Sequence, residues 1–202
     1  MDINVLDNIV PLNLLDKYNE IQLSYLRARA DVDYNFYSTV IEYGQDYNNK
    51  QAEINFSTTF LHKEAEDIWR WFKEKTNIQD NNLESCYVNG MSYGDEGYAH
   101  QDGNHIVTCI FYMNNPWHSQ WSGETVFYSG DFINDYSDKW YYEHEIIKSV
   151  LPRYGRILLF DGKVPHSVKP LSKNCLMVRK TFMLKLVNTT TKHILDGLNN
   201  AA

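Results

Sequence analysis

From about Glu84 onward, short runs of β-favouring residues alternate with turn-forming residues. The runs that resemble strands lie at Val107–Met113, Thr125–Tyr128, Ile157–Phe160 and Leu176–Val187. Turn-forming pieces such as Asn114-Asn115-Pro116 and Asp161-Gly162-Lys163 separate them. Many short strands separated by turn-forming segments predict a sandwich or jelly roll rather than a βαβ sheet.

Residues 1–80 have a different, helical pattern. Pro11 suits the first turn of a helix, after which apolar side chains recur at steps of three and four residues, at Leu14, Leu15, Tyr18, Ile21 and Tyr25. A second apolar stripe comprises Leu61, Ala65, Ile68, Trp69 and Phe72. We expect a strand at Phe36–Tyr43 between the two helices. The prediction is one domain, mainly β with N-terminal helices: a helical support region at 1–80, a β core at 84–187 and a C-terminal tail at 188–202.

Composition and charge exclude several classes of protein. The chain has 202 residues and three cysteines, which excludes a disulfide scaffold. No apolar run approaches the roughly 20 residues of a membrane-spanning helix. Neither a secretory signal nor a C-terminal retention signal is visible, so we expect a cytoplasmic protein. A net charge of −7 without an obvious basic stripe argues against a nucleic-acid partner.

Two histidines and one aspartate are candidate metal ligands. In the extended segment His100-Gln101-Asp102, the first and third side chains point to the same side and can bind one ion, although a single such pair arises readily by chance. His166 follows an apolar strand and a turn, which places it at the mouth of a β barrel. Two imidazoles and one carboxylate suit a non-haem Fe(II) oxygenase. The alternative is that His166 is a surface loop residue.

The last predicted strand carries two adjacent cations. By the two-residue period of a strand, Lys180 shares a face with apolar Phe182 and Leu184, whereas Arg179 and Lys185 lie on the opposite face. If the apolar face packs on the helices, Arg179 points into the barrel, where a dicarboxylate co-substrate can neutralise it through a bidentate contact. The alternative is an edge strand with both neighbouring cations in solvent.

Taken together, the stretch from Ser85 to Leu186 resembles the catalytic core of the Fe(II)- and 2-oxoglutarate-dependent dioxygenases. Within that superfamily it is most similar to the prolyl 4-hydroxylases, including the hypoxia-sensing type. The matching segments are, in order, Tyr93–Asp102, Val107–Asn114, Ser122–Phe127 and Gly155–His166. The resemblance implies a double-stranded β-helix, or jelly-roll, core braced by helices, with iron ligands at His100, Asp102 and His166.

The resemblance also implies how the co-substrate is held. Arg179 matches the salt-bridge partner of the distal 2-oxoglutarate carboxylate, and Tyr112 matches a tyrosine that hydrogen-bonds the same carboxylate. Tyr93 matches a tyrosine that lines the co-substrate and substrate site. The alternative for each tyrosine is a plain core residue. The spacing from His166 to Arg179 is longer than usual in the family, which makes Lys180 a competing anchor, but strand parity favours Arg179.

The implied activity is hydroxylation of a C–H bond with Fe(II), 2-oxoglutarate, O₂ and ascorbate, and the implied substrate is a prolyl residue in a protein or peptide. The alternatives are a hydroxylase of a free amino acid or other small molecule, a nucleic-acid demethylase, and a non-catalytic jelly-roll binding module. The segment Tyr128–Glu145 is longer and more aromatic than in similar proteins. It is either a flap that contacts substrate through Trp140, Tyr141 and Tyr142 or an extended hairpin.

Overall fold

The computed structural model describes residues 2–20, 37–44, 59–95, 97, 99–130 and 145–200. Ile21 and Tyr25 of the first predicted helix, Phe36, and the aromatic residues Trp140, Tyr141 and Tyr142 lie outside this part of the chain. The α-helices and β-strands in chain order are β1 (Ile3–Leu6), α1 (Leu12–Asn19), β2 (Tyr37–Tyr43), α2 (Lys63–Thr76), β3 (Leu83–Met91), β4 (Val107–Tyr112), β5 (Thr125–Tyr128), β6 (Ile146–Val150), β7 (Ile157–Asp161), β8 (His166–Val168), β9 (Arg179–Leu186) and α3 (Thr191–Asn199). Within the described residues, no helix is both long enough and apolar enough to cross a lipid bilayer.

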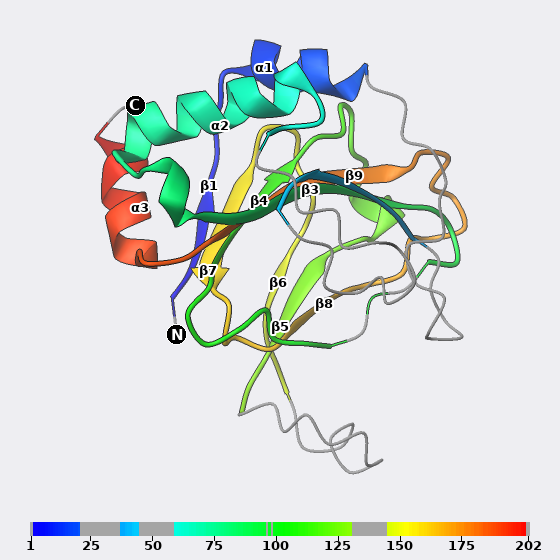
Figure 1. The fold of residues 1–202 in the computed structure, drawn as a ribbon. Coiled ribbons are helices and arrows are strands. Elements are labelled where there is room, and N and C mark those ends of the chain that lie inside the picture. The colour runs from blue at the N-terminus through cyan, green and yellow to red at the C-terminus, as the bar shows by residue number, and fades with distance from the viewer. Residues whose placement is uncertain are drawn as a thin grey trace, which may run out of the picture.

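Two antiparallel sheets form the core. The larger sheet has the order β1-β7-β4-β9-β3-β2, and the smaller one has the order β6-β5-β8. Figure 1 shows the helices gathered on one side of the larger sheet and the smaller sheet on the other. The predicted fold class, a mainly β jelly-roll core braced by helices, is confirmed.

The helices pack on one face of the larger sheet because each has an apolar stripe. Phe72 of α2 lies edge-on to Phe111 of β4 at 6.0 Å between ring centroids, and Phe111 contacts Phe182 of β9 at 5.7 Å. Each of these rings is fully buried, and each such burial stabilises the fold by about 1.5–3 kcal/mol. Leu61, which the sequence assigned to the stripe of α2, instead precedes the helix and is exposed. The prediction for that residue is wrong.

The opposite face of the larger sheet turns toward the smaller sheet. Successive residues of β4 alternate between the two sides, so that Phe111 faces the helices while Ile110 and Tyr112 join the cluster between the sheets. In β9, Phe182 likewise faces the helices and Met183 faces the interior. The interior faces of β4 and β9 therefore carry the side chains that line the candidate site.

The sequence patterns did not predict β1, α3 or the position at which β9 begins. Strand β1 is too short to show a period and is held by pairing with the edge of β7. The segment expected to be a C-terminal tail contains α3, whose first turn is capped by Thr190 and whose Ile194 and Leu198 are buried. The last strand begins at Arg179 rather than at Leu176, which is 91% exposed.

Candidate metal and anion site

Backbone pairing brings the three predicted metal ligands together. His100 and His166 exchange two backbone hydrogen bonds, each 2.9 Å long. The backbone N–H of Asp102 donates to the carbonyl of Gly162, in the turn between β7 and β8, at 2.8 Å. One ligand atom from each of the three side chains lies within 4.8 Å of the others. Residues far apart in the sequence therefore converge at one point.

A backbone contact orients the ring of His166. Its Nδ1 lies 2.9 Å from the carbonyl oxygen of Val164, a contact in which Nδ1–H donates, and this directs Nε2 toward Asp102, 3.6 Å from Oδ2. The rings of Phe127 and Phe160 pack against the imidazole. Burial, with a smaller contribution from His100, lowers the pKa of His166 to about 4. At pH 7 the ring is therefore neutral, as a metal ligand must be.

The low pKa of His166 predicts a loss of stability in mild acid. Between pH 6.5 and about 4, the unfolded chain takes up a proton on this residue and the folded protein does not. We expect the free energy of unfolding of the metal-free protein to fall by up to about 3 kcal/mol as the pH is lowered through this range. Urea unfolding at a series of pH values, in the presence of a chelator, measures this change in the free energy of unfolding. The variant His166→Gln should show a shallower dependence, and equal slopes for the two proteins would contradict the prediction.

Two donors on neighbouring strands hold the carboxylate of Asp102, whose side chain is 2% exposed. Thr108 on β4 donates to Oδ2, and the Nζ of Lys185 on β9 lies 2.9 Å from Oδ1. Burial by itself would raise the pKa of Asp102, but His166, His100 and Lys185 outweigh it and hold the pKa well below its usual range. Asp102 is therefore an ionised, oriented carboxylate that is able to serve as an oxygen ligand.

Lys185 is the site residue that sequence reasoning missed. Strand parity placed it on the same face as Arg179, but no pattern showed that this end of β9 lies against Asp102. Burial opposes the charge on Lys185, yet Tyr87 and Asp102 outweigh it and raise the pKa of Lys185 above its ordinary value. Its ammonium group is therefore charged at neutral pH.

Arg179 lies on the interior face of β9, as strand parity predicted, and is 2% exposed. Its Nε donates to the carbonyl of Gly123 at 2.8 Å, and its Nη2 donates to Thr125 Oγ1 at 3.3 Å. Among the described residues, no carboxylate forms an ion pair with this guanidinium. Lys180 points to the opposite face, where it donates to the carbonyl of Asn19. Arg179 therefore offers a buried positive charge that can bind a carboxylate.

Tyr112 lies next to Arg179 in the interior. The guanidinium carbon is 5.3 Å from the centroid of the tyrosine ring, and the phenol oxygen is 2.8 Å from Thr125 Oγ1. Burial raises the pKa of Tyr112, so its hydroxyl is protonated and can donate a hydrogen bond. The tyrosine and the arginine are thus placed to bind the same anion.

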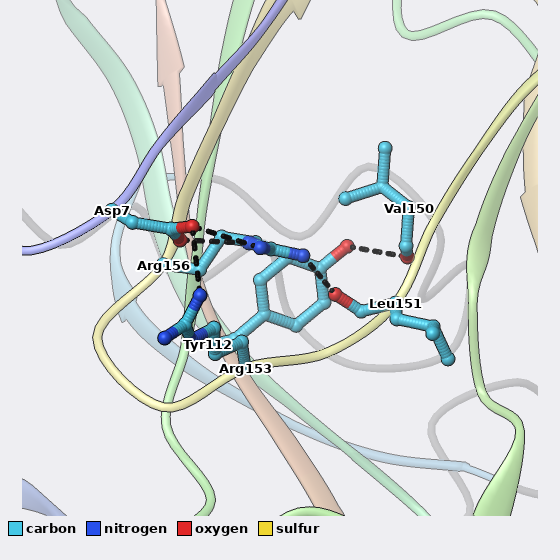
Figure 2. A network of polar contacts seen from close by, with 6 residues as sticks. All are labelled: Asp7, Tyr112, Val150, Leu151, Arg153 and Arg156. Atoms are coloured by element: carbon cyan, nitrogen blue, oxygen red, sulfur yellow. Dashed lines mark hydrogen bonds and ion pairs between the residues drawn. The ribbon is translucent and has the colours of Figure 1, made fainter. Parts of the chain in front are cut away.

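A polar network lies beside Tyr112, whose backbone N–H donates to the carbonyl of Arg156 at 3.0 Å (Figure 2). Asp7, which follows β1, accepts hydrogen bonds from Nε and Nη2 of Arg156 at 2.8 and 2.9 Å. Arg156 also donates to the carbonyl of Leu151, and Arg153 lies 3.3 Å from Asp7. The bidentate pair ties the N-terminal segment to the turn before β7. No sequence pattern predicted this pairing.

The structure places Tyr93 differently from Tyr112. Its backbone bridges to Leu171, and its side chain is 65% exposed. Arg179 and Tyr112, in contrast, are buried together. Tyr93 therefore lies outside the buried pair of Arg179 and Tyr112, although its exposed ring is available to a larger ligand.

The donor set fits one class of metal. Two imidazoles and one carboxylate, contributed by His100, His166 and Asp102, offer three ligand atoms that lie within 4.8 Å of one another. This arrangement suits non-haem iron in its Fe(II) state and leaves coordination positions for other ligands. The separate cluster of Arg179 and Tyr112 suits a carboxylate. The two parts together can hold a metal and an anionic molecule in the same interior.

Comparison with known proteins agrees with this geometry. A family model described as the 2OG-Fe(II) oxygenase superfamily matches residues 86–184. That range contains all three candidate metal ligands and Arg179. No curated protein sequence matches the chain.

Solved structures share the fold at low sequence identity. A Pseudomonas putida prolyl-4-hydroxylase has a TM-score of 0.54 and 15% identity, over 93% of each chain. A Trichoplax adhaerens prolyl hydroxylase, in complex with a hypoxia inducible factor oxygen degradation domain peptide fragment, has a TM-score of 0.54 and 16% identity over 99% of this chain and 87% of that one. An oxidoreductase of the 2OG-Fe(II) oxygenase family from Burkholderia pseudomallei has a TM-score of 0.55 and 11% identity, over 93% and 84%.

Proposed function

We propose, because the chain belongs to the 2OG-Fe(II) oxygenase superfamily, that it hydroxylates a prolyl residue in a protein or peptide. The observation that carries the proposal is the convergence of His100, Asp102 and His166 within one bonding cluster. A binding module without catalytic activity has no need of three converging ligand atoms together with a buried guanidinium that, among the described residues, has no ion-pair partner.

In this proposal, His100, Asp102 and His166 hold Fe(II). When bound, the metal supplies activation of O₂, coupled to oxidation of 2-oxoglutarate to succinate and CO₂. The protein orients the ligands: Val164 fixes the ring of His166, and Thr108 and Lys185 fix the carboxylate of Asp102. Ascorbate is included as the reductant that keeps the iron ferrous.

Arg179 and Tyr112 bind the distal carboxylate of 2-oxoglutarate in this proposal. The guanidinium supplies a charge-assisted contact, and the tyrosine hydroxyl supplies a hydrogen bond. Because both side chains are buried, the carboxylate exchanges water for fixed donors. Thr125, which contacts both side chains, holds them in place.

The choice of substrate rests on the structural neighbours. Two of them are prolyl hydroxylases, one of which is bound to a peptide fragment. A proline ring is apolar and rigid, so it is ordered on binding at low entropic cost. The exposed ring of Tyr93 offers an apolar surface for such a ligand.

Succinate formation tests both levels of the proposal. With Fe(II), 2-oxoglutarate, ascorbate and O₂, we expect slow succinate release by the protein alone and faster release when a proline-containing peptide is added. The variant His100→Ala is the inactive control. Stimulation by free amino acids or methylated nucleic acid instead of the peptide would contradict the prolyl assignment, and absence of succinate under every condition would contradict the enzymatic one.

A further inference from the structure

Lys185 forms an ion pair with the proposed carboxylate ligand. Its Nζ is 2.9 Å from Asp102 Oδ1, and the two side chains are 22% and 2% exposed. The contact is set by strand register, because Lys185 on β9 lies opposite Thr108 on β4, which donates to the other oxygen of Asp102. Lys185 therefore contacts the proposed ligand Asp102 directly, from its position on strand β9 of the larger sheet.

The groups packed around Lys185 leave Asp102 as its charge partner. Tyr87 on β3 presents its ring at 5.7 Å from the ammonium nitrogen, and Thr108 is neutral. Asp102 is the acid within ion-pair distance of Lys185 in the part of the chain that the structure describes. In the metal-free protein, the negative charge of Asp102 is therefore already balanced by the positive charge of Lys185.

A divalent cation bound at Asp102 must share this carboxylate with the lysine. Two imidazoles, which bind a metal in their neutral form, and one carboxylate offer the metal a net charge of −1, and a nearby ammonium cancels it. In a partly buried site with an effective dielectric constant near 20, charges a few ångströms apart interact by several kcal/mol. The repulsion between the lysine and the metal is therefore large enough to alter metal affinity.

We propose that Lys185 is a positioning residue that serves as the internal counter-ion of Asp102, so that it stabilises the metal-free fold and weakens metal binding. This inference rests on the metal site of the proposed function. Lys185 therefore makes release of the metal easier, because its ammonium group still neutralises the Asp102 carboxylate after the metal has left. A lysine that only oriented the carboxylate would have the opposite effect on affinity, since loss of such a partner typically weakens metal binding 10–100-fold.

Mn(II) binding separates the two roles. We expect Lys185→Met to bind Mn(II) about 10-fold or more tightly than the natural protein, as measured by competition with a chelating dye. In the presence of a chelator, the same variant should unfold at a lower urea concentration, because Asp102 is left buried without its partner. Added Mn(II) should restore its stability more than it stabilises the natural protein.

Matched variants make the result interpretable. Lys185→Arg keeps the charge and should restore both properties, whereas Lys180→Met removes a lysine from the opposite face of β9 and should change neither. If Lys185→Met folds only when metal is bound, Lys185→Gln is used in its place, with the same measurements of Mn(II) affinity and of stability. Weaker or unchanged Mn(II) binding by the neutral variants would overturn the inference. If His100→Ala binds Mn(II) as well as the natural protein, the proposed metal site itself fails, which is a distinct outcome.

Discussion

Replacing Asp102 with alanine is expected to abolish iron binding and succinate formation. The variant removes the single carboxylate of the proposed ligand set, which lies within 4.8 Å of both imidazole ligand atoms. Loss of an outer partner of a metal ligand costs 10–100-fold in affinity, so loss of the ligand itself should weaken Fe(II) binding by more than about 100-fold. Anaerobic equilibrium dialysis measures the affinity, and the succinate assay measures the activity.

Folding has to be separated from binding in this variant. Asp102→Ala leaves the half-buried Lys185 without its ion-pair partner, which can cost up to about 3–5 kcal/mol of stability. His100→Ala is the matched ligand variant, because the side chain of His100 is 54% exposed and its removal disturbs packing little. Asp67→Ala, which breaks an ion pair with the exposed Arg70 one turn along α2, is the neutral control. Iron binding at the natural level by folded Asp102→Ala would contradict the ligand assignment.

Replacing Arg179 with alanine is expected to remove co-substrate binding while leaving the metal bound. The guanidinium is buried and has no ion-pair partner among the described residues, so its charge is available to a carboxylate. A truncated partner of a buried charge pair costs about 2–5 kcal/mol, so the KM for 2-oxoglutarate should rise by about 100-fold or more. Fe(II) affinity in the absence of co-substrate should stay within a few-fold of the natural value.

Lys180 supplies the control for Arg179. It lies on the same strand but turns to the opposite face, where it contacts Asn19 of α1. Lys180→Ala should therefore leave the KM for 2-oxoglutarate nearly unchanged. The reverse pattern, with Lys180→Ala abolishing co-substrate binding and Arg179→Ala tolerated, would show that the anchor is assigned to the wrong residue.

The orientation of these two cations could be predicted from the sequence because it depends on local geometry. Phe182 and Leu184 define an apolar face of β9 by a two-residue period, and that period fixes where Arg179 and Lys180 point. The pair of His100 and Asp102 could be predicted for the same reason, because two residues separated by one position in an extended segment point to the same side. The convergence of His166 on that pair followed only from the resemblance of several ordered segments, since spacing does not specify which loops meet.

Contacts between distant segments could not be predicted. Lys185 was correctly placed on the interior face by parity, but its contact with Asp102 depends on how the loop before β4 folds back over β9. The pair of Asp7 and Arg156 joins the N-terminal segment to the turn before β7, and each residue alone is an ordinary surface charge. Strand β1 is similarly determined by its partner rather than by its own four residues.

Anomalous diffraction at the iron absorption edge, from crystals grown anaerobically with Fe(II) and 2-oxoglutarate, tests the metal site most directly. The expected result is one iron peak within bonding distance of His100, Asp102 and His166, with the distal carboxylate of the co-substrate at Arg179. An iron peak at another position, or the absence of any peak between these three side chains, would contradict the account.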